Sequence, residues 1–168
     1  MKTKVTKDTI PEGFTLKLAI VDAIPVLLFA ADMIIVGLLF SSKLFLLGSL
    51  LMLYAGTCKV IWKIIVATKK KNVWFLFIQM RYVMPVGFIL MIVGTLLNLN
   101  SFSILFNSII QMPEIIFFVL GIIGMVLMLI FMFFLDGEKS KNNWIEQFTN
   151  LIAQLSFFVG LLLVLINR

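Results

Sequence analysis

The sequence contains no histidine and only one cysteine. Without histidine, the chain lacks the commonest metal ligand, the usual haem ligand and the usual general base. Cys58 cannot form a disulfide within the chain, and we expect it to be a buried structural thiol. The sequence also has no nucleotide-binding glycine loop, zinc-protease motif or nucleophile elbow. These absences predict no metal site and no cofactor. They leave an integral-membrane enzyme acting on a lipid as the third of three hypotheses.

Charged residues are scarce as well. Only 13% of the 168 residues are charged, whereas 62% are hydrophobic. Soluble domains are about one quarter charged, so this chain has too few polar side chains to cover a soluble globule. The charges stand in short clusters between long apolar runs, which is typical of an integral membrane protein. We attribute the net charge of +6 to lysines on one side of a membrane and expect no nucleic-acid partner.

Five apolar runs are long enough for a transmembrane helix, which needs about 20 residues. They cover residues 18–40, 44–66, 73–97, 114–135 and 144–166. The sequence therefore predicts an all-α polytopic bundle of five transmembrane helices. The bundle forms one domain over residues 18–168, and a basic arm at 1–17 precedes it. Segment 98–113 has polar residues at helical spacing, which predicts an amphipathic helix at the outer surface.

Lysines set the expected orientation of the bundle. One side of the membrane would hold those at positions 2, 4, 7, 17, 69, 70, 71, 139 and 141, and the other side only Lys43 and Arg168. Cytoplasmic loops carry the excess of lysine and arginine. We therefore expect a cytoplasmic N-terminus and an external C-terminus in a cell membrane. The abundance of Lys, Ile, Asn and Phe suggests an AT-rich genome and hence a bacterial plasma membrane.

Polar side chains gather in the inner halves of the predicted spans. An ionisable residue at the centre of a span costs roughly 2.5–3.5 kcal/mol on insertion scales, and such residues usually face the bundle interior and pair. We predict a polar recess open to the cytoplasm, with a net positive charge because one acid faces three bases. Its candidate ligand-binding residues are Asp22, Lys59, Arg81, Gln147, Asn150 and Gln154.

Several of these residues have simpler explanations. Lys63, one helical turn after Lys59, is expected to extend its side chain to the inner surface, and Lys59 could do the same. Asp22 needs only an ion pair with Lys59, Lys63 or Arg81. Arg81 is too deep to reach the surface easily, which favours a ligand or ion-pair role.

Asp32 differs from the other charged residues. It lies about 21 Å from the inner end of its span, where no basic residue is level with it. We expect it to be protonated, hydrated, or hydrogen-bonded to Ser49, Tyr54 or another hydroxyl or amide group. Two roles remain open: coupling to a proton or cation, or hydrogen bonding between helices.

Two main hypotheses follow for function. The first is a membrane binding or transport protein whose inward-facing recess takes an anionic or zwitterionic small molecule or lipid headgroup, with proton coupling through Asp32. The second is a non-catalytic accessory or assembly subunit of a membrane complex. The expected partners are membrane lipids, a small-molecule ligand, and a partner membrane protein or a second copy of the chain.

Overall fold

The computed structural model describes residues 15–135 and 140–167, and every regular element in these ranges is an α-helix. The helices are α1 (Leu16–Leu39), α2 (Lys43–Lys69), α3 (Trp74–Ile78), α4 (Met80–Leu96), α5 (Leu99–Ile109), α6 (Glu114–Phe134) and α7 (Ser140–Ile166). Most of the predicted basic arm, residues 1–14, lies outside the described ranges, as does Lys139.

Five helices are long and apolar enough to cross a membrane: α1, α2, α3 together with α4, α6 and α7. The predicted all-α bundle with five candidate spans is therefore confirmed. Large apolar side chains remain exposed on the outer helices, including Ile89 and Leu96 on α4 and Ile122 and Leu129 on α6. Side chains of this kind suit contact with lipid, and we treat the chain as a multi-pass membrane protein.

Hydroxyl side chains cap the first two long helices. Thr15 Oγ1 accepts a hydrogen bond from the Leu18 amide at 3.2 Å, and Ser42 Oγ accepts one from the Phe45 amide at 3.4 Å. These bonds satisfy amides that have no partner within the first turn. Helix α1 then continues through Pro25 to Leu39.

The third span is interrupted at Gln79, which separates α3 from α4. Pro85 lies farther along α4 and cannot donate an amide hydrogen bond within it. At the interruption, the buried Gln79 side chain donates to the carbonyl oxygens of Leu76 at 3.2 Å and Ala55 at 3.5 Å. The second bond ties the interruption to α2.

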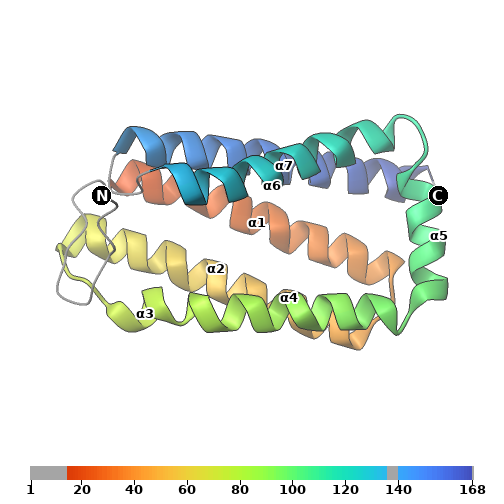
Figure 1. The fold of residues 1–168 in the computed structure, drawn as a ribbon, viewed down its shortest axis with the longest axis horizontal. Helices are drawn as coiled ribbons and strands as arrows, with labels where there is room; N and C mark the ends of the chain where they lie inside the picture. Colours follow the sequence, from red (N-terminus) through yellow and green to blue (C-terminus); the bar gives the residue numbers. More distant parts are fainter. Residues whose placement is uncertain (1–14, 136–139, 168) are drawn as a thin grey trace.

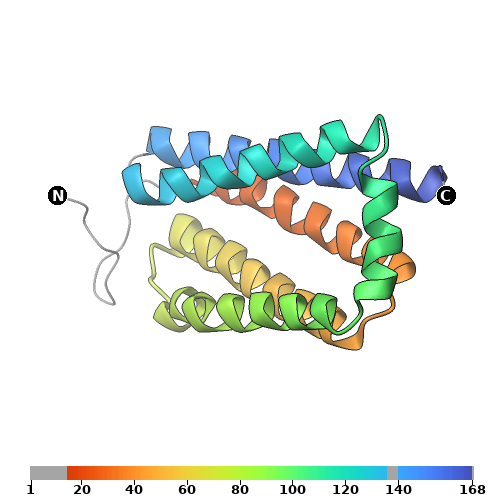
Figure 2. The same ribbon diagram turned by 45° about the vertical axis from the view of Figure 1, so that its right-hand side comes forward.

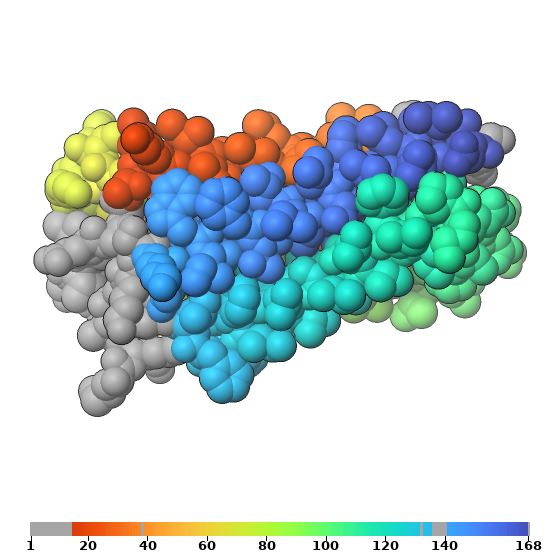
Figure 3. Space-filling model, turned by 90° about the horizontal axis from the view of Figure 1, so that it is seen from above, coloured from red at the N-terminus to blue at the C-terminus, as the bar shows by residue number. Residues whose placement is uncertain are grey.

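The long helices pack in the order α4, α2, α1, α7 and α6. In Figure 1 they run side by side along the long axis, and Figure 3 shows α7 lying between α1 and α6. Figure 2 shows the pair α2–α4 and the pair α6–α7 on either side of α1, with α5 crossing one end of the bundle. We call this end the α5 end and the other the α3 end.

Helices α2 and α4 approach closely at Gly48 and Gly87. A Cβ atom on Gly87 would lie 2.7 Å from the carbonyl oxygen of Gly48, and one on Gly48 would overlap the carbonyl oxygen of Gly87. Because the obstructing atoms belong to the backbone, a side chain at either position would force the helices apart. Small residues in membrane helices commonly allow two backbones to approach closely.

Each end of the bundle has its own apolar core. At the α3 end, Leu18, Trp62 and Val66 are buried together. At the α5 end, Phe40, Leu105 and Val164 form a second cluster, against which Phe102 and Ile109 of α5 pack. Helix α5 is thus held by its apolar side, while its polar residues Asn100, Ser103 and Asn107 are exposed.

Candidate functional site

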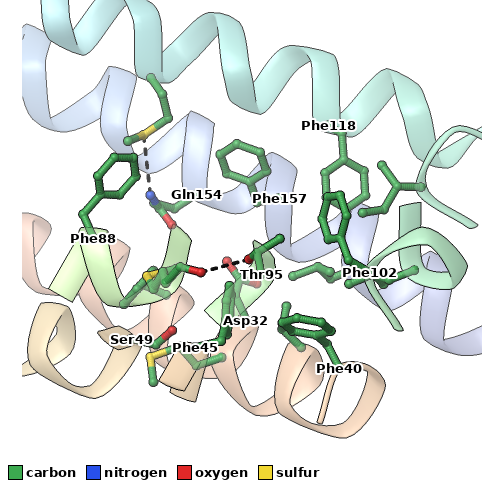
Figure 4. Close-up of a pocket in the computed structure, with 18 residues that line it drawn as sticks. Asp32, Phe40, Phe45, Ser49, Phe88, Thr95, Phe102, Phe118, Gln154 and Phe157 are labelled. Carbon is green, nitrogen blue, oxygen red and sulfur yellow. Dashed lines mark hydrogen bonds between the residues drawn. The ribbon is translucent and has the colours of Figure 1, made fainter. Parts of the chain in front are cut away.

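A cavity of about 400 Å³ lies between the two helix pairs, next to the apolar core of the α5 end. We call it the lateral cavity. Helices α1, α2, α4, α5, α6 and α7 all contribute side chains to it, as does Phe40 at the end of α1 (Figure 4). Its 18 lining residues are Phe29, Asp32, Met33, Val36, Phe40, Phe45, Ser49, Phe88, Met91, Thr95, Phe102, Leu105, Ile109, Phe118, Met125, Gln154, Phe157 and Leu161.

The lining is mainly aromatic. Seven of its side chains are phenylalanines, and three are methionines. Two lining residues are largely exposed: Phe88 on α4, with 56% of its surface accessible, and Met125 on α6, with 42%. The cavity therefore opens sideways between α4 and α6, on the flank of the bundle that would face lipid.

Asp32 is the only charged side chain in this lining. It is 7% exposed, and its Oδ1 atom has no hydrogen-bond partner. The Oγ atom of Ser49, also in the lining, is likewise buried without a partner, so the expected hydrogen bond between the two is not made. Tyr54, the other suggested partner, is half exposed and does not line the cavity.

Gln154 is the second predicted site residue that lines this cavity. It is half-buried, and its amide Nε2 lies 3.7 Å from the Met125 sulfur across the gap between α7 and α6. In Figure 4, Gln154 and Asp32 lie on different sides of the cavity among the phenylalanine rings. A ligand in the cavity would thus meet one carboxyl group, one amide and the hydroxyl groups of Ser49 and Thr95 in otherwise apolar surroundings.

The remaining predicted site residues lie towards the α3 end. There, Asp22 of α1 forms an ion pair with Lys63 of α2, with 2.7 Å between Oδ2 and Nζ. The short distance between the opposite charges stabilises both groups. Lys59 and Glu146 are also close enough to act on Lys63 electrostatically. These four groups carry two positive and two negative charges.

Lys63 therefore does not extend to the surface as expected. Its side chain is only 3% exposed, because Asp22 supplies an opposite charge on the neighbouring helix at the same depth. Of the three partners considered for Asp22, the structure thus selects Lys63.

Arg81 is exposed and does not join this group. Its guanidinium carbon lies 5.6 Å from the centre of the Phe77 ring, a cation–π contact near the α3 end of its own span. The face of α4 that packs on α2 carries Gly87 and Gly94, and helical geometry places Arg81 about 120–140° away from both. With Arg81 absent and Glu146 present, two acids and two bases balance, and the predicted net positive charge of the recess is lost.

Two further residues of the prediction lie on α7. Gln147 is buried, with its Oε1 atom lacking a hydrogen-bond partner, and Asn150 is half-buried one turn later. The structure thus brings Asp22 and Lys59 to the surroundings of Lys63, and it brings Asp32 and Gln154 to the lateral cavity. The predicted residues do not form one site.

Sequence reasoning missed most of the lateral cavity. Its phenylalanines are scattered from position 29 to position 157, and their convergence depends on how five spans pack. It also missed polar links at the α5 end, where Asn167 Nδ2 donates to the buried Glu114 Oε1 at 2.6 Å.

Comparisons with protein-family models, curated proteins and solved structures gave no match. Function must therefore be argued from the chain's own residues.

Proposed function

We propose that this chain is a small multi-pass membrane protein, expected in a bacterial plasma membrane, that binds a mostly apolar small molecule in the lateral cavity. The observation that carries the proposal is Asp32. It is a buried carboxyl group with an unpartnered oxygen, in a cavity lined by phenylalanine. A buried polar atom without a partner is costly, and a ligand group could supply the missing interaction.

The size and lining of the cavity suit such a ligand. Small-molecule sites usually have about 300–1,000 Å³ and are mostly apolar with a few polar groups. The lateral cavity has about 400 Å³ and a few polar side chains, among them Asp32, Ser49 and Gln154. A ligand dissolved in the bilayer could enter between Phe88 and Met125 without passing through water.

The hypothesis that the protein binds an anionic ligand, which the sequence favoured, is weakened by the structure. That hypothesis rested on Arg81 adding to an excess of positive charge near Asp22. Arg81 is exposed, and the charges of Asp22 and Glu146 balance those of Lys59 and Lys63. If the protein transports a ligand, the lateral cavity would be the site that binds it. Uptake of that ligand into vesicles that contain the reconstituted protein would measure transport.

Two matched threonine substitutions test the binding proposal. Thr95 lines the cavity, whereas Thr57 is exposed on α2, and each hydroxyl donates to the carbonyl four residues earlier. Thr95→Phe should fill the cavity and weaken binding of the neutral probe N-phenyl-1-naphthylamine at least about tenfold, or 1.4 kcal/mol. Thr57→Phe should bind the probe like the wild type.

The probe's fluorescence would be measured in lipid nanodiscs and corrected with empty nanodiscs. Both variants would be checked for thermal unfolding, because an unfolded Thr95→Phe protein would not report on the cavity. Folded Thr95→Phe protein that binds the probe as strongly as the wild type would contradict the proposal. A smaller substitution, Thr95→Leu, should give an intermediate loss.

A second candidate function is supported by Arg81. An exposed guanidinium group within an apolar span is expensive unless it reaches the surface or meets a partner. This favours the accessory-subunit hypothesis, in which Arg81 pairs with an acid on another membrane protein or a second copy of the chain. The test is affinity purification under mild detergent. A partner recovered with the wild type and lost with Arg81→Leu supports this role, whereas an unchanged recovery contradicts it.

A further inference from the structure

We infer that the lateral cavity takes an amphiphilic organic cation with an aromatic or branched apolar body, and that the cation replaces the proton of Asp32. The inference rests on the proposed function, because it names the ligand class of the same cavity. It differs from the sequence expectation, which favoured an anionic or zwitterionic ligand.

The charge of the lining points to a cation. Asp32 is the sole ionisable side chain among the 18 lining residues. A carboxylate in apolar surroundings is unstable without a counter-charge, and no basic side chain is among the lining residues of the cavity. A bound cation would supply that counter-charge. A bound anion would meet either an uncharged site or a repelling carboxylate.

The rings of the lining point the same way. Phenylalanine faces attract cations, and binding of quaternary ammonium groups by aromatic cages uses this attraction. Rings reach the cavity from α1, α2, α4, α5, α6 and α7, and each ring that turns its face to a central cation would attract it. The same rings would bury the apolar body of the ligand.

No other ionisable group faces Asp32 from within the lining. The helices around the cavity do carry such groups elsewhere: Lys17 and Asp22 on α1; Lys43, Tyr54, Cys58, Lys59, Lys63 and Lys69 on α2; Arg81 and Tyr82 on α4; Glu114 on α6; and Lys141 and Glu146 on α7. Of these, Lys43 is exposed and Glu114 accepts the hydrogen bond from Asn167. Titration in the cavity would therefore belong to Asp32.

The exchange is simple in chemical terms. In the free protein, Asp32 holds its proton as a neutral carboxylic acid. When the cation enters, the O–H bond breaks, the proton leaves to water, and the carboxylate remains as the counter-ion. No bond forms to the ligand, and one proton leaves for each cation bound. Affinity for the cation should therefore rise about tenfold per pH unit while the free carboxyl group is protonated.

Tetraphenylphosphonium and tetraphenylborate test the charge preference, because they have nearly the same size and shape but opposite charge. In nanodiscs carrying the wild-type protein, and after correction with empty nanodiscs, tetraphenylphosphonium should bind at least about tenfold more tightly. Titration calorimetry in two buffers of different protonation enthalpy should show about one proton released per cation.

Asp32→Asn removes the titrating group but keeps an amide of similar size that can donate and accept hydrogen bonds. It should unfold at nearly the wild-type temperature and lose the preference for the cation together with the pH dependence. Glu114→Gln is the matched control, since it changes a buried acid of a spanning helix outside the cavity. It should keep both properties.

The outcomes separate the two proposals. If Thr95→Phe does not weaken binding of the neutral probe, the lateral cavity is not a ligand site and both proposals fall. If the probe binds in a Thr95-dependent manner but tetraphenylborate binds as well as tetraphenylphosphonium, only the cation inference is overturned. Cation binding that is unchanged in Asp32→Asn would also overturn it.

Discussion

The Asp22 carboxylate and the Lys63 ammonium lie 2.7 Å apart, and both side chains are almost wholly buried. They join α1 to α2 at the α3 end of the bundle, far from the lateral cavity along α1. A buried pair of this kind contributes little net stability compared with well-packed apolar residues, yet breaking it is costly. Its main effect here is to fix how α1 is rotated against α2.

Removing one partner of this pair should destabilise the protein strongly. Lys63→Met leaves the Asp22 carboxylate buried without this counter-charge, and Asp22→Asn removes the carboxylate that pairs with the buried lysine. Each change should cost about 3–5 kcal/mol. The double variant should recover part of this loss because neither charge remains. Thermal and chemical unfolding in detergent would measure the three free-energy differences.

Arg81 provides the control for this cycle. Its side chain is exposed, so Arg81→Met should have a small effect of its own. When Arg81→Met is combined with Asp22→Asn, the two changes in the free energy of unfolding should add to within about 0.5 kcal/mol, as expected for independent sites. A coupling energy between Asp22 and Arg81 larger than that between Asp22 and Lys63 would contradict the ion pair described above.

Gly48→Ala should destabilise the pairing of α2 with α4. The added methyl group meets the Gly87 carbonyl oxygen, and forcing extra volume into a close contact costs about 1–3 kcal/mol. Gly37→Ala on α1 is the matched control, because nothing lies within 4 Å of its added Cβ. It should be neutral or stabilising by up to about 1 kcal/mol, since alanine favours the helix. Equal effects of the two substitutions on thermal unfolding would rule out the close contact.

The expected orientation can be tested by labelling single cysteines in intact cells, in a Cys58→Ala background. Asn100 on α5 and Lys71 between α2 and α3 are both exposed and lie at opposite ends of the bundle. A membrane-impermeant thiol reagent should label Asn100→Cys and leave Lys71→Cys unlabelled until the cells are opened. The reverse pattern would show that the lysine-rich loop faces outward and that the orientation expected from the lysines is wrong.

The sequence was sufficient to predict the spans, because runs of about 20 apolar residues have few alternatives to a transmembrane helix. The interruption at Gln79 was not foreseen. It depends on a side chain that bonds to the carbonyl of Ala55 in another helix, and a single span does not reveal such a bond. An ion pair between Asp22 and Lys63 could also be anticipated, since positions along neighbouring spans show which residues are level with each other.

Rotation about the helix axes was harder to predict than depth. Arg81 has the depth of a recess residue but lies on the far face of α4, because Gly87 and Gly94 occupy the face that packs on α2. Attention to these two glycines, seven residues apart, would have indicated that face. The lateral cavity had no comparable signal, since its phenylalanines look the same in sequence as those that would face lipid.

The contact of Gly48 with Gly87 also has a calorimetric consequence. Separating α2 from α4 within a bilayer would expose these backbone atoms and their neighbours to lipid chains instead of water. The large heat-capacity change of protein unfolding comes from hydration of newly exposed apolar surface, and this step hydrates very little. The free energy of the helix pair should therefore vary almost linearly with temperature, without the maximum near room temperature that soluble domains show. Scanning calorimetry of the reconstituted protein would measure this small heat capacity. Any weakening of the bundle in the cold would then originate in the ordering of the surrounding lipid.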